Sequence, residues 1–128
     1  MSNAPIGRSF DEVVQARVRQ EPEFGEVLLQ EAVQMMLAGE LDVARSLIRD
    51  VIKGSIGYAE LSRCTGTPEK SLVRMFGPNG NPTAANMFSV LAQLQRHSGV
   101  SLQVQAVPIA RKRSGKPRST SARRAALA

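Results

Sequence analysis

Apolar residues recur at the spacing of one face of an α-helix along most of the chain. The clearest such stripe consists of Phe24, Val27, Leu28, Ala32, Met35 and Met36. Together the stripes predict helices over residues 10–20, 24–38, 41–53, 58–65, 68–76 and 83–98. We therefore expect an all-α fold for most of the chain.

Residues at the ends of these stripes are typical of helix termini. Ser9 and Glu12 match the capping box, in which a hydroxyl accepts a hydrogen bond from a backbone N–H of the first turn. Thr83 is a second candidate N-cap. Four predicted helices are followed by glycine, at Gly39, Gly54, Gly66 and Gly99. A left-handed backbone that ends a helix carries no steric penalty for glycine.

The period changes to two after Gly99. Leu102, Val104 and Ala106 alternate with glutamines, and Pro108 ends the run. This alternation predicts a short C-terminal β-strand over residues 102–106. A lone strand is not stable, and no second strand candidate exists in the sequence. We therefore expect it to pair with the same strand of a second copy, in a homodimer.

Charge is distributed very unevenly along the 128 residues. The net charge is +6, yet residues 1–108 carry 10 basic and 11 acidic side chains, whereas residues 109–128 carry seven basic and none acidic. The tail residues include Arg111, Lys112, Arg113, Lys116 and Arg118. Their Ser, Gly, Pro and Ala neighbours predict a disordered basic arm. A run of one sign favours a nucleic acid as partner over a merely solubilising tail.

Several classes of function have little material in this sequence. Cys64 and His97 are the single residues of their kinds, so no disulfide, metal site or nucleophile–base pair is expected. We expect no cofactor and no enzymatic activity. No apolar run is long enough to span a membrane and no secretory leader is apparent, so a cytoplasmic protein is expected. We also expect Cys64 to be at least half-buried and His97 to lie at the surface.

Residues 58–76 have the spacing of a helix-turn-helix. Leu61 would face the core, the small Ser62 would allow close approach of the two helices, and Gly66 would make the turn. Pro68 would occupy the first helical position after Thr67 as cap. The second helix would be anchored by Leu72, Met75 and Phe76. An ordinary helical hairpin with a solvated polar side is the alternative interpretation.

The outward residues of the second helix have the chemistry needed to read bases. They are Glu69, Lys70, Ser71, Val73 and Arg74. Lys and Arg donate to guanine O6 and N7, Glu accepts from the cytosine amino group, and Ser serves either role.

Three segments give the chain a more specific likeness. They are Thr-Gly-Thr-Pro-Glu-Lys-Ser-Leu at 65–72, Arg-Met-Phe-Gly-Pro at 74–78 and Gly-Asn-Pro-Thr-Ala-x-Asn at 80–86. With them, residues 10–107 resemble bacterial helix-turn-helix regulators related to addiction-module antidote proteins, the antitoxin members of the lambda-repressor-like superfamily. The resemblance implies a dimeric, often autoregulatory DNA-binding transcription regulator. In toxin-paired members it also implies a toxin partner.

The resemblance also implies roles for particular residues. Lys70, Ser71 and Arg74 become base-reading candidates, with Thr67 and Glu69 near the groove edge. The DNA-backbone candidates are Gly80, Asn81, Thr83 and Asn86, in and after a loop that leads into a helix N-terminus. Considered without the resemblance, Asn79-Gly80 is equally well explained as a plain turn and Thr83 as a plain cap.

The expected organisation has four parts: a disordered N-terminus over 1–9, a helical region over 10–54, a helix-turn-helix region with its strand over 55–108, and the basic arm over 109–128. The leading hypothesis is a dimeric, sequence-specific regulator of double-stranded DNA. The competing hypothesis is a protein-interaction subunit, in which helices over 10–53 clamp a toxin and DNA binding is weak and non-specific.

Overall fold

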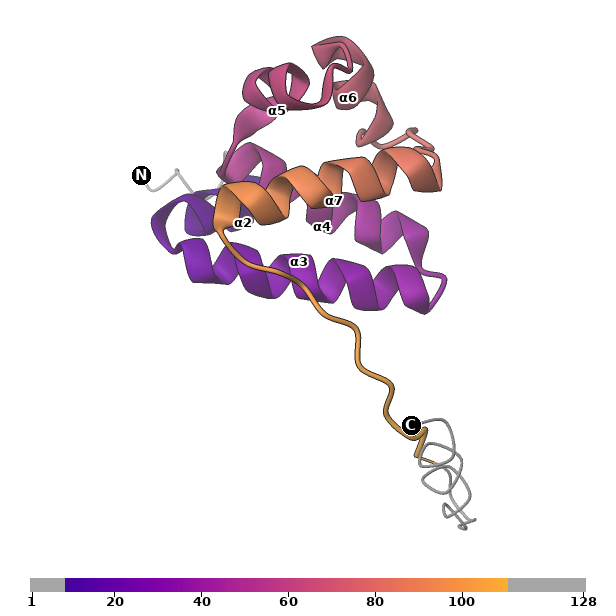
Figure 1. Cartoon of the computed structure of the whole chain (residues 1–128). Helices are drawn as coiled ribbons and strands as arrows, with labels where there is room; N and C mark the ends of the chain where they lie inside the picture. The colour runs from indigo at the N-terminus through magenta and orange to yellow at the C-terminus, as the bar shows by residue number, and fades with distance from the viewer. Residues whose placement is uncertain (1–8, 111–128) are drawn as a thin grey trace.

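The computed structural model describes residues 9–110, which form six α-helices and contain no β-strand. The helices are α2 (Phe10–Gln20), α3 (Pro22–Leu37), α4 (Leu41–Gly54), α5 (Gly57–Thr65), α6 (Glu69–Met75) and α7 (Ala84–Ser98). In Figure 1, α3 lies lowest, α7 crosses in front of α4, and α5 and α6 cover the top. The all-α class predicted from the sequence is confirmed.

Most of the helix ends follow the local signals in the sequence. Ser9 Oγ accepts from the Glu12 amide at 3.1 Å, and Thr83 Oγ1 accepts from the Asn86 amide at the same distance. Left-handed glycines occur after α3, α5 and α7, at Gly39, Gly66 and Gly99. These five expectations are confirmed, because each of these ends is determined by residues within one turn of it.

Gly54 was expected to end its helix in a left-handed conformation, and that expectation is wrong. It is the last residue of α4, and the left-handed glycine that follows is Gly57. Gly54 is buried where α2 crosses the end of α4. A Cβ there would lie 2.7 Å from the Val18 Cβ and 2.7 Å from the Gln15 carbonyl oxygen. The glycine therefore permits close approach of two helices.

A buried polar group joins α2 to α4 beside this crossing. The Asp50 carboxylate accepts from Gln15 Nε2 at 2.8 Å and from Arg49 Nη2 at 3.2 Å. Arg49 also forms an ion pair with Asp11 at 2.9 Å, and Asp50 is only 5% exposed. Because a buried carboxylate is costly unless it is hydrogen-bonded, these partners fix the position of α2.

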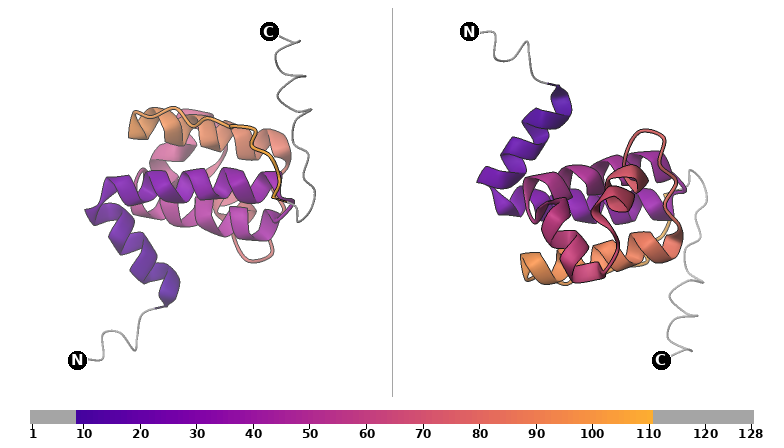
Figure 2. Two further views of the ribbon diagram at one scale, coloured as in Figure 1. Left: turned by 90° about the horizontal axis from the view of Figure 1, so that it is seen from below. Right: turned by 90° about the horizontal axis from the view of Figure 1, so that it is seen from above.

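One hydrophobic core joins the five helices from α3 to α7. Its largest fully buried side chains are Leu29, Ile48, Val51, Ile52, Leu61, Leu72, Phe76, Val90 and Leu94. Seen from below, α3 and α7 run side by side and α2 projects from them at an angle (Figure 2). Not every residue of the apolar stripes is buried, since Phe10 is 79% exposed and Phe88 is 58% exposed.

The strand predicted over residues 102–106 is absent from the part of the chain that the structure describes. Residues 100–110 cross in front of α3 and lead away from the body without helix or strand (Figure 1). The Leu102 amide donates to Gln95 Oε1 at 2.7 Å, and the Gln103 carbonyl accepts from Gln30 at 3.5 Å. In the single chain, these two glutamine side chains bond to the backbone of the segment where a neighbouring strand would do so in a sheet.

Two terminal segments lie outside the described residues: residues 1–8, and residues 111–128 with Arg111, Lys112, Arg113, Lys116 and Arg118.

Candidate nucleic-acid interface

Helices α5 and α6 are joined by a short turn whose backbone is held by hydrogen bonds. Gly66 has a φ of 80°, and its amide donates to the Ser62 carbonyl at 2.9 Å. Ser62 Oγ donates in turn to the Thr67 carbonyl at 2.6 Å, and the Thr67 amide donates to Thr65 Oγ1 at 3.2 Å. The glycine thus makes the turn as expected, and the Ser62 hydroxyl contributes a hydrogen bond that the sequence did not predict.

The start of α6 differs from the expectation by one residue. The helix begins at Glu69, and Pro68 precedes it as an N-cap with an extended ψ of 141°. No side chain caps this end, so Thr67 is not its cap and Pro68 is not its first helical residue. The proline fixes φ at the helix entrance and removes one backbone donor that would otherwise need a partner.

Helix α6 is held by one apolar side and presents the other to solvent. Leu72 and Phe76, which directly follows the helix, are fully buried, while Ser71 and Met75 are half-buried. Four exposed residues line a shallow hollow on the outer side: Glu69, Lys70, Val73 and Arg74. We call these four residues the α6 face. Of the predicted base readers, Lys70, Arg74 and Glu69 lie on it, whereas Ser71 and Thr67 lie partly covered beside it.

Helix α5 contributes further charged side chains close to the α6 face. Arg63 is exposed and pairs with Glu60 one turn earlier, with Nε 3.1 Å from Oε1. Hydrogen bonding from Arg63 holds the pKa of the Glu60 carboxyl below its usual value. Sequence reasoning did not single out Arg63.

Cys64, expected to be at least half-buried, is exposed on α5, so that expectation is wrong. Its position follows from Leu61, which takes the buried side of α5.

The loop between α6 and α7 is fixed to the core by Arg45 of α4. Arg45 Nη1 donates to the Gly80 carbonyl at 3.1 Å and to Asp42 Oδ1 at 2.9 Å, and Nη2 donates to the Pro78 carbonyl at 3.4 Å. The Arg45 side chain is 13% exposed. Sequence analysis missed this residue, because its loop partners lie more than thirty positions away in the chain.

The four candidate DNA-backbone residues have different surroundings. Gly80 packs so closely on α6 that a Cβ would lie 1.9 Å from the Met75 carbonyl oxygen, and its own amide donates to Gly77. Asn81 and Thr83 are exposed, although the Thr83 hydroxyl already caps α7. Asn86 is half-buried. Asn81 and Thr83 are therefore the accessible ones of the four, and Gly80 has a clear packing role.

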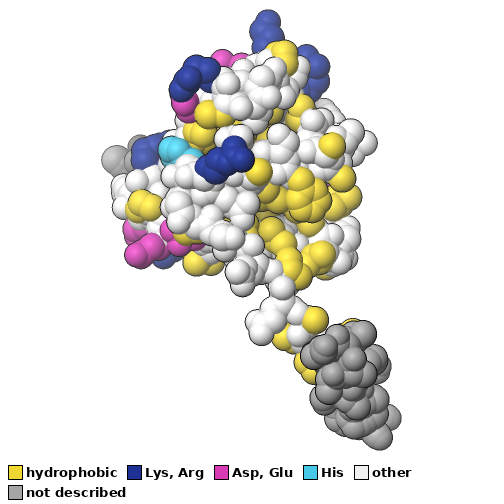
Figure 3. Space-filling model, viewed as in Figure 1, with side chains coloured by type: hydrophobic (Ala, Val, Ile, Leu, Met, Phe, Trp, Pro, Cys, Tyr) yellow, Lys and Arg dark blue, Asp and Glu magenta, His cyan; other side chains and the backbone are white. Residues whose placement is uncertain are grey.

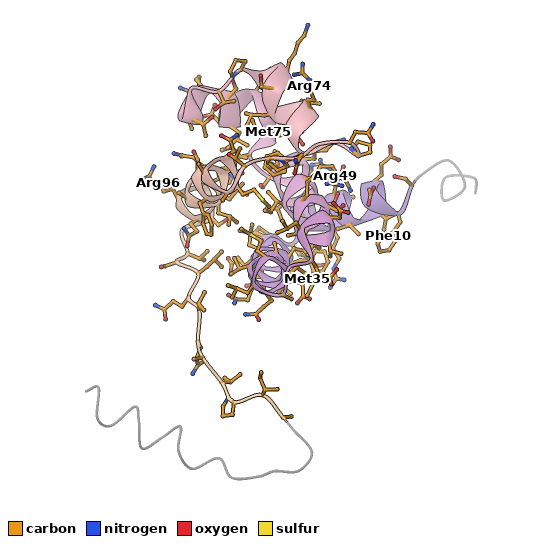
Figure 4. The ribbon with its side chains drawn as sticks, turned by 90° about the vertical axis from the view of Figure 1, so that its right-hand side faces the viewer. Phe10, Met35, Arg49, Arg74, Met75 and Arg96 are labelled. Atoms are coloured by element: carbon orange, nitrogen blue, oxygen red, sulfur yellow. The ribbon has the colours of Figure 1, made fainter. Side chains whose placement is uncertain are left out.

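Lys and Arg side chains gather at one end of the molecule. Figure 3 shows several of them at the top, over α5 and α6, with Asp and Glu side chains beside them. Helices α5 and α6 together carry Arg63, Lys70 and Arg74 against Glu60 and Glu69. The view in Figure 4 shows Arg74 at the outermost end of the body, far from Met35 of α3. The α6 face thus occupies a weakly basic tip.

Neither family models, nor curated proteins, nor solved structures give a match to this chain. Among residues 9–110, none of the helices combines the length and the apolar character needed to cross a membrane. Within the same range, no cluster of three or more His, Cys, Asp and Glu side chains is arranged to hold a metal ion. His97 is exposed near the end of α7, as expected.

Proposed function

We propose that this protein is a sequence-specific, double-stranded DNA-binding transcription regulator that inserts α6 into the major groove. The observation that carries the proposal is the α6 face: a short helix held by Leu72 and Phe76 projects Lys70 and Arg74 from the tip of the molecule. A helix of this kind fits the width of the groove, and its side chains can donate to guanine. The resemblance noted in the sequence supports the same interpretation, a lambda-repressor-like helix-turn-helix.

The charge distribution supports one orientation on DNA. Helices α5 and α6 carry Arg63, Lys70 and Arg74 against Glu60 and Glu69. Helix α3, on the opposite side of the body, carries Glu23, Glu26 and Glu31 and no basic residue (Figure 1). A polyanion attracts the first end and repels the second, so the complex forms with α6 toward the duplex. The seven basic residues of 109–128 add phosphate contacts that do not depend on sequence.

The regulator is proposed to bind as a homodimer, with one α6 in each half-site. Residues 100–110 support this, because Val104, Val107 and Ile109 are exposed on a segment that pairs with no strand among the described residues. Pairing of this segment with a second copy would supply the neighbouring strand that the single chain lacks. A two-fold dimer reads half-sites about 34 Å apart, one turn of DNA. By resemblance, its role is that of an antitoxin-type repressor.

Fluorescence anisotropy of the full chain tests the proposal directly. The probes are a labelled duplex of the protein's own upstream region and a scrambled duplex, each at two salt concentrations. We expect tighter binding to the upstream duplex, and a preference that persists at the higher salt, because base contacts are less screened than phosphate contacts. Equal binding to both duplexes that vanishes with salt would overturn base reading.

A second function is favoured by exposed apolar side chains on the N-terminal helices. They are Phe10, Val13, Val27, Leu37, Leu41 and Val43. Such residues suit a protein partner, so the alternative function is a toxin-neutralising subunit with only weak, non-specific DNA binding. Co-expression with the neighbouring reading frame tests it: a stable one-to-one complex that forms without DNA, and that Phe10→Asp disrupts, would favour this function.

A further inference from the structure

The α6 face contains one residue whose side chain cannot make a hydrogen bond. Val73 is 47% exposed and lies between Lys70, one helical turn earlier, and Arg74, the next residue. The other apolar side chains of the helix turn inward: Leu72 is fully buried and Met75 is half-buried. An isopropyl group is therefore set among charged groups on the surface that we propose faces the base edges.

The chemistry of the groove indicates what this side chain can recognise. Three of the four bases present only donors and acceptors in the major groove, and thymine adds a C5-methyl group. Val73 can neither donate nor accept, so polar base edges gain nothing from it. Contact with a methyl group removes apolar surface of both partners from water.

We propose that Val73 determines specificity by packing against the C5-methyl group of a thymine in each half-site. This rests on the proposed function. Lys70 and Arg74 are attracted to guanine O6 and N7, and both flank Val73 on the same face. The DNA sequence that the α6 face reads should thus contain a thymine next to a guanine, or one base away from it. Glu69 at the same hollow favours a cytosine amino group at the edge of the step.

The test removes the methyl group from the DNA and leaves every hydrogen-bonding group in place. A duplex is first selected by the full chain from a random library. Each thymine is then replaced, one at a time, by deoxyuridine, and the Kd is measured for the wild type and for Val73→Ala. Val43→Ala is the matched control, because Val43 is an exposed valine of similar accessibility, 44%, on α4.

The expected result is one thymine per half-site at which deoxyuridine weakens wild-type binding about fourfold, the effect of one buried methyl group. At that position, deoxyuridine has a smaller effect on Val73→Ala, whose shorter side chain buries less of the methyl group, and its usual effect on Val43→Ala. The wild-type measurement tests whether a thymine methyl group is recognised at all, and the comparison with Val73→Ala assigns that contact to Val73.

Two other outcomes would overturn the inference and are distinguishable. If the library yields a defined sequence, but no thymine is sensitive or the sensitivity is undiminished in Val73→Ala, then only the role of Val73 is wrong. If the library yields no enriched sequence, the proposed base-reading function fails and the role of Val73 fails with it.

Discussion

Arg45 of α4 donates a hydrogen bond to the carbonyl oxygen of Gly80, 35 positions further along the chain, at 3.1 Å. The same guanidinium reaches the carbonyl of Pro78 and the carboxylate of Asp42. The loop that follows the α6 face is thereby joined to a helix that lies at the centre of the core. Arg45 thus adds a polar anchor for this loop to the apolar anchors Leu72 and Phe76, which hold α6 itself in the core.

Replacement of Arg45 by alanine is expected to destabilise the protein by about 1–3 kcal/mol, because the partly buried Gly80 carbonyl and the exposed Pro78 carbonyl both lose a charged donor. Urea unfolding followed by circular dichroism measures this. Arg45→Lys should recover only part of the loss, since an ammonium group lacks the planar fork of guanidinium donors. A midpoint unchanged in Arg45→Ala would show that the loop is held by other contacts.

Gly80 is expected to be intolerant of a side chain. A Cβ at this position would lie 1.9 Å from the Met75 carbonyl oxygen, so the loop or the end of α6 must move in Gly80→Ala. We expect a loss of about 1–3 kcal/mol, the usual cost of forced overpacking. Gly77→Ala is the matched control in the same loop, because its Cβ would lie 3.3 Å from the nearest atom. Similar losses in the two variants would contradict this account.

The features that sequence predicted well are those whose causes are local. The caps at Ser9 and Thr83 and the glycine ends at Gly39 and Gly99 depend on contacts within one helical turn. The same is true of the turn at Gly66. These signals predicted the order of the six helices and placed their bounds within two residues. The pattern of α6 predicted which of its residues are exposed, apart from the half-buried Ser71.

The features that sequence missed depend on contacts between distant residues. Gly54 ends a stripe just as a helix-ending glycine does, yet its cause is Val18 on another helix. Arg45 looks like any solvated arginine until its loop partners are known. Cys64 was expected to be buried because cysteine usually is, yet Leu61 takes the buried side of α5. The strand expected at 102–106 is a different case, because it was predicted to form only against a second copy, which the single chain does not contain. Period and composition contain no information on such partners.

The pKa of Tyr58 reports how far its hydroxyl, on α5, is removed from water. Desolvation raises the pKa of its hydroxyl to about 12, partly countered by the positive charge of Arg49. Because Tyr58 is the single tyrosine and the chain has no tryptophan, tyrosinate absorbance reports this residue alone. We expect a midpoint near 12 in the folded protein, against 10.0 for the ordinary group.

The sign of the resulting pH dependence follows from linkage. The folded state retains the Tyr58 proton at pH values where the unfolded state has lost it. The contribution of the neutral Tyr58 hydroxyl to the free energy of unfolding is therefore fully present below about pH 10, and it is lost as the pH rises toward 12. Tyr58→Phe should be less sensitive to pH in this window, as measured by urea unfolding. A midpoint of 10 in the folded wild type would show that the hydroxyl is in contact with water.

Deletion of residues 109–128 is expected to weaken binding to every duplex alike. The segment holds seven basic residues and no acidic ones, so it is expected to bind phosphates rather than bases. The slope of log Kd against log salt should fall by about 0.9 for each phosphate that the arm no longer neutralises. Anisotropy titrations over a range of salt concentrations measure it. An unchanged slope would exclude the arm from the interface.

Arg74→Ala is expected to affect specific binding above all. Its guanidinium lies at the tip of the α6 face, where a bidentate contact to guanine is worth about 1–3 kcal/mol of discrimination. The selected operator should therefore be bound more weakly by that amount, whereas a scrambled duplex is affected only by the removal of one charge. Arg17→Ala, on α2 away from the basic tip, removes the same charge from another exposed site and should leave the preference unchanged. Equal losses on both duplexes for Arg74→Ala would show that Arg74 binds phosphate, and α6 would not then read sequence through this residue.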